Sequence, residues 1–274
     1  MQTVLIDGIT TLYGAFVEYG LDDGPRTVEY GFLEKILDLQ ESFSDAQFVV
    51  LWGNLFHPDR KDFFEQYGRR GANFQAFGLN DIRQSLQTSL PTFGVDQYTT
   101  DRGEVYDLFV SAQDNWTEPM LVYSADRRFL CFVDTTTVVK IAEDRLYDPD
   151  VVSQVFNVTP PEMKTYLSLL GDQTIGIPGV DLHRQHVGRL VEESDDPEEI
   201  FEAEGSSLLH DEQVTLSAFY PQFKLNQRLI EPIDVTYEMQ EGEYDEETME
   251  EYIETFPGLE LQDLKSNNGF MKYN

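Results

Sequence analysis

The sequence predicts an α/β fold in which a core with a mostly parallel sheet is followed by a helical extension. Apolar, β-branched runs of four or five residues recur in the first half of the chain, and a polar residue or glycine stops each of them, as is typical of buried strands. Helical patterns separate these runs, which favours a parallel sheet covered on both faces. After residue 150 only helical patterns continue.

The expected core elements alternate along the chain. Because the carboxyl ends of parallel strands meet at one edge of a sheet, where the chemistry of such folds collects, the polar residues that end these strands are candidate site residues. Three strands end at or next to Asp7, Asn54 and Asp126. In chain order the expected strands cover residues 3–6, 48–52, 120–123 and 136–139, and the expected helices cover 26–40, 58–67, 78–89 and 103–113.

The expected extension contains a helix that opens at Pro160-Pro161, since proline is tolerated in the first turn. The acid-rich stretch 238–254 is open to two interpretations, an acidic amphipathic helix or mobile, solvated chain. We therefore expect a core over residues 1–149 and a helical extension over 150–274. The extension's predicted helices cover residues 151–156, 161–170, 182–192 and 225–230, with loops at 171–179 and 194–197.

The composition excludes several classes of protein. The chain has 274 residues, enough for one large domain or two small ones, and 41% of them are hydrophobic, which argues against global disorder. No apolar run reaches the ~20 residues of a membrane span, and the first residues lack a secretion signal, so we expect a cytoplasmic protein, in the host cytoplasm if a virus encodes it. The single cysteine, Cys131, excludes an internal disulfide and a thiolate zinc site.

The formal charge is −32, and it is spread unevenly. Residues 191–274 carry 23 of the 51 acidic residues but only 4 of the 19 basic ones. A uniformly acidic surface repels nucleic acid, whose binding depends on phosphate neutralisation. Two explanations stay open: adaptation to high salt, which screens the repulsion, or an acidic segment that leaves a basic patch elsewhere.

Five acidic residues stand at or beside predicted element ends. Glu104 and Asp107 are three residues apart, so both carboxylates point the same way on a helix. Clustered carboxylates without His or Cys suit Mg²⁺ or Mn²⁺, whose usual task is to activate water and hold a phosphodiester during in-line displacement. The candidate metal ligands are Asp7, Glu104, Asp107, Asp126 and Asp172, of which the first four are the candidate catalytic residues.

Several sequence blocks follow one another in a recognisable order: a strand ending in Asp7-Gly8, Trp52-Gly53-Asn54, Gly103-Glu104-Val105-Tyr106-Asp107 and Ser124-Ala125-Asp126-Arg127-Arg128. A leucine-rich helix, Gly171-Asp172, a polar loop and Ile177-Pro178-Gly179-Val180 come next and are the most specific block. Over about residues 1–192 this order resembles the flap endonuclease and 5′→3′ exonuclease family, particularly its small bacteriophage members. Asn226-Gln227-Arg228-Leu229-Ile230 is a weaker match further on.

The resemblance implies a PIN-like core and a metal-dependent nuclease of DNA replication that hydrolyses phosphodiesters at free or branched 5′ ends of DNA or RNA–DNA duplexes. It also implies a helix-loop-helix element that grips duplex phosphates, with phosphate or K⁺ at the loop Gly171–Val180. We expect a monomer that meets replication proteins through its acidic C-terminal part. The residues expected to contact nucleic acid are Arg60, Lys61, Arg69, Arg70, Arg83, Arg128, Gly171, Gly176, Gly179, Arg184 and Arg189.

Four positions depart from the family pattern, which has acids where this chain has Gly53, Tyr106, Arg128 and Ile175. Two interpretations follow. Either the five remaining carboxylates still bind at least one divalent ion, with Arg128 substituting for a missing cation near the scissile phosphate, or the site is inactive and the chain is a nucleic-acid-binding or replication-accessory module. The second interpretation predicts Arg128 paired with Glu104 or Asp126. A third, an unrelated PIN-type ribonuclease, predicts no loop-helix block.

Overall fold

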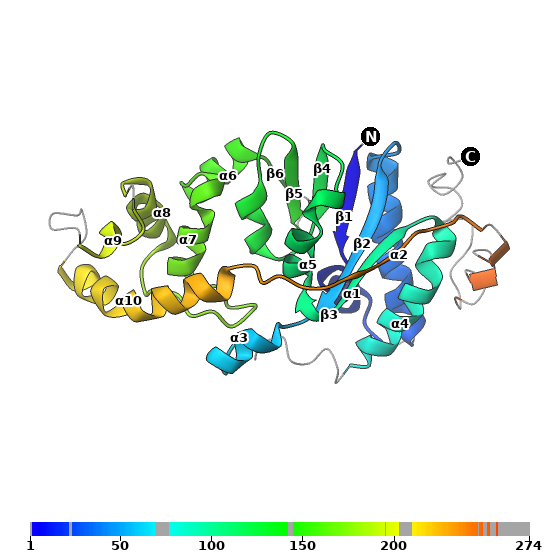
Figure 1. Ribbon diagram of the computed structural model, residues 1–274, viewed down its shortest axis with the longest axis horizontal. Helices are drawn as coiled ribbons and strands as arrows, with labels where there is room; N and C mark the ends of the chain where they lie inside the picture. Colours follow the sequence, from blue (N-terminus) through cyan, green and yellow to red (C-terminus); the bar gives the residue numbers. More distant parts are fainter. Residues whose placement is uncertain are drawn as a thin grey trace.

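A computed structural model describes residues 2–21, 24–68, 77–141, 145–194, 196–202 and 210–245, with short pieces at 247–248, 251–252 and 256. Its centre is a seven-stranded sheet in the order β6-β5-β4-β1-β2-β3-β7 (Figure 1). The five inner strands are parallel and the two edge strands antiparallel, which confirms the predicted α/β class. The strands are β1 (Thr3–Asp7), β2 (Gln47–Asn54), β3 (Asp96–Glu104), β4 (Met120–Tyr123), β5 (Thr137–Ile141), β6 (Arg145–Tyr147) and β7 (Glu238–Gln240).

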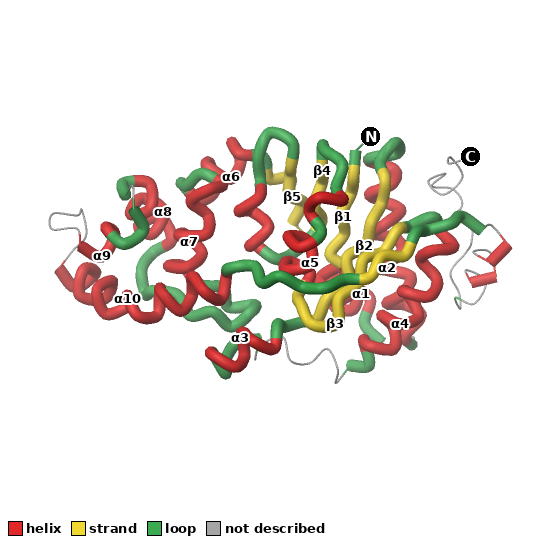
Figure 2. The backbone as a smooth tube through the Cα atoms, in the orientation of Figure 1, coloured by secondary structure: helices red, strands yellow, loops and turns green. Residues whose placement is uncertain are grey.

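Helices cover the sheet (Figure 2) and build the extension beside its β6 edge (Figure 1). None of the helices in the described part of the chain is long and apolar enough to cross a membrane. The helices are α1 (Gly8–Tyr19), α2 (Pro25–Ser42), α3 (Pro58–Phe63), α4 (Leu79–Ser89), α5 (Val105–Ser111), α6 (Pro149–Phe156), α7 (Met163–Leu170), α8 (Arg184–Glu192), α9 (Glu199–Glu202) and α10 (His210–Ile230).

All four predicted strands form, but the sequence pattern misses three others. Strand β3 reads Asp-Gln-Tyr-Thr-Thr-Asp-Arg-Gly-Glu and therefore lacks an apolar run, yet it pairs with β2 on one side and β7 on the other. Strand β7 corrects the expectation that strands stop after residue 150 and that 238–254 is helical or mobile throughout. Residues 238–240 form it because β3 would otherwise expose unpaired backbone groups along its edge.

The segment that follows α10 and includes β7 returns from the extension to the core and is drawn in orange in Figure 1. We call residues 231–245 the strap. Its backbone donates to core side chains from Ile233 to Asp107 (3.0 Å), from Val235 to Ser111 (3.0 Å) and from Gly242 to Asp96 (2.8 Å). The last part of the predicted extension thus lies against the sheet of the predicted core. The division at residue 150 stays a prediction.

Candidate functional site

The carboxyl edge of the parallel strands gathers four of the five predicted acids. Asp7 is the last residue of β1, Glu104 is the last residue of β3, and Asp126 comes after β4 and the two residues Ser124 and Ala125. Asp107 lies in the first turn of α5, where it forms a capping box with Glu104. The topology brings these side chains together because β4, β1, β2 and β3 are neighbours in the sheet and run in the same direction.

Asp7 lies at the centre of this edge and caps α1. Its Oδ1 accepts from the amides of Ile9 (3.1 Å) and Thr10 (3.0 Å), and its Oδ2 accepts from the Ser124 hydroxyl (2.6 Å). Ser124 Oγ also accepts from the backbone amide of Asp126 at 3.0 Å, so one hydroxyl joins the Asp7 carboxylate to the backbone of Asp126. Burial raises the pKa of Asp7 to about 6, and the charge of Asp126 adds to the rise against these hydrogen bonds.

Arg60 lies between Glu104 and Asp107 and is fully buried. Its Nη1 donates to Glu104 Oε1 (2.9 Å) and Asp107 Oδ2 (2.7 Å), and its Nη2 donates to Asp107 Oδ1 (2.7 Å). Nη2 also donates to the carbonyl of Glu231 in the strap at 2.6 Å. Arg60 was predicted to contact nucleic acid, but its side chain is not accessible to solvent and pairs with the predicted metal ligands Glu104 and Asp107 instead.

Arg128 fills the space between Glu104 and Asp126, and only 2% of it is exposed. Its Nη2 bonds to Glu104 Oε2 and to Asp126 Oδ2 (2.6 Å), and its Nε donates to both oxygens of Asp126 (3.1 and 3.0 Å). The guanidinium lies 4.6 Å from the ring centroid of Tyr106, a favourable cation–π distance. This is the pairing that the inactive-site interpretation predicts.

The acceptor capacity of these carboxylates is largely used. An ionised carboxylate has about four lone-pair sites, and Asp107 accepts from Arg60 Nη1 and Nη2, the Glu104 amide and the Ile233 amide. Glu104 accepts from Arg60, Arg128, the His57 amide (2.8 Å) and the Tyr67 hydroxyl (2.9 Å to each oxygen). Within the described residues, no three acidic, His or Cys side chains are placed so that they could share a metal ion.

The charges around Glu104 and Arg128 keep both side chains ionised. Burial alone would raise the pKa of Glu104, but the positive charges of Arg128 and Arg60 outweigh it and hold that pKa below its ordinary value. Burial would lower the pKa of Arg128, and the charges of Asp126 and Glu104 instead raise it well above its ordinary value. Both groups are therefore charged at neutral pH, and the ion pairs are complete.

Two of the positions that lack the family's acid are filled by packing. A Cβ on Gly53 would lie 2.5 Å from the Val105 amide nitrogen and 2.6 Å from the Glu104 carbonyl carbon, so no side chain fits there. Tyr106 is 97% buried and packs edge-on against Phe129. Backbone atoms at Gly53 and aromatic packing at Tyr106 therefore occupy the space that an acidic side chain would need.

Asp172 makes its described hydrogen bonds within its own loop. Its carboxylate accepts from the amide (2.8 Å) and the hydroxyl (2.5 Å) of Thr174, and its backbone pairs with Ile177. The side chain thus shapes the loop Gly171–Val180, and no hydrogen bond or ion pair joins it to the acids at the sheet edge in the described structure. Ile175 packs against the core and its carbonyl accepts from the Gly68 amide at 2.8 Å.

The other cations predicted to contact nucleic acid differ in exposure. Lys61 and Arg184 are exposed and Arg189 is half-buried. Arg83 is half-buried and donates to the Gly53 carbonyl at 2.9 Å, and burial lowers its pKa. Arg69 and Arg70 lie outside the described residues.

Sequence reasoning missed three contributors to this edge: the Tyr67 hydroxyl, the His57 amide and the strap. Tyr67 is fully buried although it stands among polar residues, and the strap reaches Asp107 from a position 126 residues away. The aromatic and proline residues around 56–67 indicate packing, but no local pattern identifies Glu104 as its partner.

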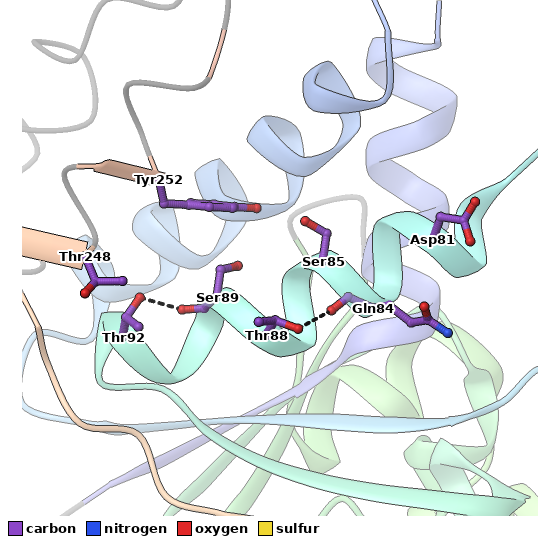
Figure 3. Close-up of a pocket in the computed structure, with 8 residues that line it drawn as sticks. All are labelled: Asp81, Gln84, Ser85, Thr88, Ser89, Thr92, Thr248 and Tyr252. Carbon is purple, nitrogen blue, oxygen red and sulfur yellow. Dashed lines mark hydrogen bonds between the residues drawn. The ribbon is translucent and has the colours of Figure 1, made fainter.

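A separate cavity of about 470 Å³ lies between α4 and the short segment around Tyr252 (Figure 3). The described residues that line it include several hydroxyl groups and one acid, Asp81, and no Lys, Arg or His. It therefore offers neither a cage of acids for a metal ion nor cations for a phosphate.

Two curated proteins are similar to this chain in sequence. No protein-family model matches the chain. It is similar to DNA polymerase I of Caldicellulosiruptor bescii, with 26% identity over an alignment of 219 residues that covers 74% of this chain and 25% of that protein. It is also similar to a 5′-3′ exonuclease of Buchnera aphidicola, with 21% identity over an alignment of 186 residues that covers 65% of this chain and 64% of that protein. The chain thus spans less than two thirds of the length of either relative.

Solved structures show the fold. The T5 5′-exonuclease with bound zinc superposes with a TM-score of 0.67 at 14% identity, over 84% of this chain and 89% of that one. The catalytic core of Rad2 in complex with DNA substrate superposes with a TM-score of 0.62 at 12% identity, over 97% and 90% of the two chains. The predicted PIN-like 5′ nuclease fold and the resemblance to 5′→3′ exonucleases and flap endonucleases are confirmed.

Proposed function

We propose that this chain binds DNA or RNA–DNA duplexes with 5′ ends or flaps, as a relative of the 5′ nucleases, and that two arginines occupy its carboxylate cluster in place of divalent metal. One observation carries the proposal: Arg60 and Arg128 are buried between Glu104, Asp107 and Asp126 and form ion pairs with all three. The chain then retains the fold for recognition and lacks the machinery for cleavage.

A metal ion does not fit this arrangement. Mg²⁺ and Mn²⁺ require several free oxygen ligands, and the oxygens here already accept from guanidinium, amide and hydroxyl groups. The buried atom of this network that lacks a partner in the described residues is a donor, Arg60 Nε, so the network is not short of a cation. A metal ion shared by Glu104, Asp107 and Asp126 would require both arginines to leave their buried positions, and breaking such buried ion pairs is costly.

Recognition falls to the extension. The loop Gly171–Val180 leads to α8, whose first residue, Arg184, is exposed and whose N-cap, His183, is also exposed. Backbone amides at a helix start favour anions, and Arg184 and Arg189 supply charge for phosphates. K⁺ at this loop stays a prediction, as do the monomeric state, the cytoplasmic location and contacts of the acidic C-terminal part with replication proteins.

The active-nuclease interpretation is the second candidate, because the acids converge at the same edge and Asp7 has no arginine partner in the described structure. Ser124 joins the Asp7 carboxylate to the backbone of Asp126, and a single ion could bind between the two carboxylates if Arg128 moved away from Asp126. The relatives named 5′-3′ exonuclease favour this candidate as well.

One experiment separates the two candidates. A labelled 5′-flap duplex is incubated with the chain and Mg²⁺ or Mn²⁺ at low and at molar salt, and binding and cleavage are measured together. We expect binding without cleavage. Cleavage that Asp7→Ala and Asp126→Ala abolish, and that the exposed control Asp134→Ala leaves intact, would establish the nuclease. Absence of binding at every salt concentration would refute both candidates.

A further inference from the structure

The loop Gly171–Val180 is formed by two backbone arms in direct contact. A Cβ on Gly179 would lie 1.9 Å from the Leu170 carbonyl oxygen, so only glycine allows the arms to approach. Asp172 and Ile177 exchange both backbone hydrogen bonds (2.9 and 2.8 Å), and the Val180 amide donates to Leu169 at 2.8 Å. The first arm continues from α7 and the second leads to α8.

The last carbonyls of α7 have no helical donor, and that of Ser168 is one of them. The Ser168 carbonyl would ordinarily accept from the amide of Asp172, but that amide donates to Ile177 instead. A buried carbonyl without a donor is costly, so another group must supply the hydrogen bond.

Asn226 of α10 supplies it. The side chain is fully buried, and its Nδ2 donates to the carbonyls of Ser168 (2.8 Å) and Pro178 (2.7 Å). Its Oδ1 accepts from Gln222 Nε2 at 2.9 Å, which orients the amide. We propose that Asn226 is a positioning residue that locks the two arms of the loop Gly171–Val180 together and thereby sets the start of α8 for duplex phosphates.

Both amide protons of Asn226 are needed, one for each arm. The acceptor from α7 and the acceptor from the Ile177-Pro178-Gly179 turn lie on opposite arms, so loss of either bond frees one arm from α10. Arg184 begins α8 four residues after Val180, and a shift of the second arm moves it directly. This inference rests on the proposed duplex binding.

The test compares Asn226→Asp and Asn226→Leu with wild type, and Gln222→Ala serves as the matched control on the same helix because it keeps both donated bonds. Duplex affinity is measured by fluorescence anisotropy. At neutral pH we expect Asn226→Asp and Asn226→Leu to weaken duplex binding at least tenfold, and Gln222→Ala to stay within about threefold of wild type. As the pH falls, the aspartate becomes protonated and regains one donor, so its affinity ratio to wild type should recover while that of Asn226→Leu does not.

Amide hydrogen exchange gives a readout that does not depend on DNA. We expect the amides of Asp172, Ile177 and Val180 to exchange faster in Asn226→Leu than in wild type or Gln222→Ala. Folded Asn226 variants with wild-type affinity, or with unchanged exchange at these amides, would overturn the inference. If wild type binds no duplex while loop exchange still depends on Asn226, the proposed function fails and the locking role stands.

Discussion

Arg128→Asp puts a carboxylate back at a position where the family pattern has one, and the structure predicts its effect. The substitution removes the guanidinium that pairs with Glu104 and Asp126 inside the protein. Removing one partner of a buried ion pair costs about 3–5 kcal/mol. Since 1 kcal/mol corresponds to about 2–4 °C for a chain of this size, the melting temperature without metal should fall by on the order of 10 °C.

The same substitution creates a cluster of acids that needs a cation. We therefore expect Mg²⁺ or Mn²⁺ to stabilise Arg128→Asp, by about 2.7 kcal/mol when the metal is at one hundred times its dissociation constant. Wild type should show almost no metal-dependent shift, because its acids are already paired. Thermal unfolding with and without metal measures both effects.

Two controls define the result. Arg127 is the exposed neighbour of Arg128, so Arg127→Asp makes the same change in charge without opening the site, and its melting temperature should change little. Arg128→Met removes the cation without adding a ligand, so it should be destabilised but not rescued by metal. Arg128 does not take the place of a metal ion if metal raises the melting temperature of wild type by several degrees, or if Arg128→Met responds to metal as Arg128→Asp does.

Three further outcomes follow from individual residues. Because burial raises the pKa of Asp7 to about 6, the native state binds more protons than the unfolded chain between about pH 4 and pH 6. The free energy of unfolding should therefore fall as the pH rises through this window, by up to ~3 kcal/mol. Asp7→Asn should remove this pH dependence when unfolding is measured in urea. Gly179→Ala should destabilise the protein by about 3 kcal/mol or more, since its Cβ meets a backbone carbonyl at 1.9 Å, whereas Gly14→Ala, in an open helical position, should stabilise it slightly; equal effects in thermal unfolding would contradict the geometry. Arg184→Ala should reduce the slope of log affinity against log salt for duplex DNA by about 0.9, and an unchanged slope would exclude a phosphate contact at that residue.

The periodicity of the sequence was sufficient to predict four of the seven strands and most of the described helices. Apolar runs such as residues 48–52 signal buried strands because every residue there meets the core from one face or the other. The polar strand β3 was missed because its place between β2 and β7 depends on pairing rather than on its own composition. The same limit applies to β7, whose partner lies more than 130 residues away.

The sequence by itself placed Asp7, Glu104, Asp107 and Asp126 at one edge, because strand ends converge in a parallel sheet. It also showed which acids of the family pattern this chain lacks. The tertiary structure alone decided that Arg60 pairs with Glu104 and Asp107 and that the strap closes over them. The physical reason is that a pattern of spacing reports which side chains share an element, whereas the partner of a buried charge depends on which distant group reaches it when the chain is folded.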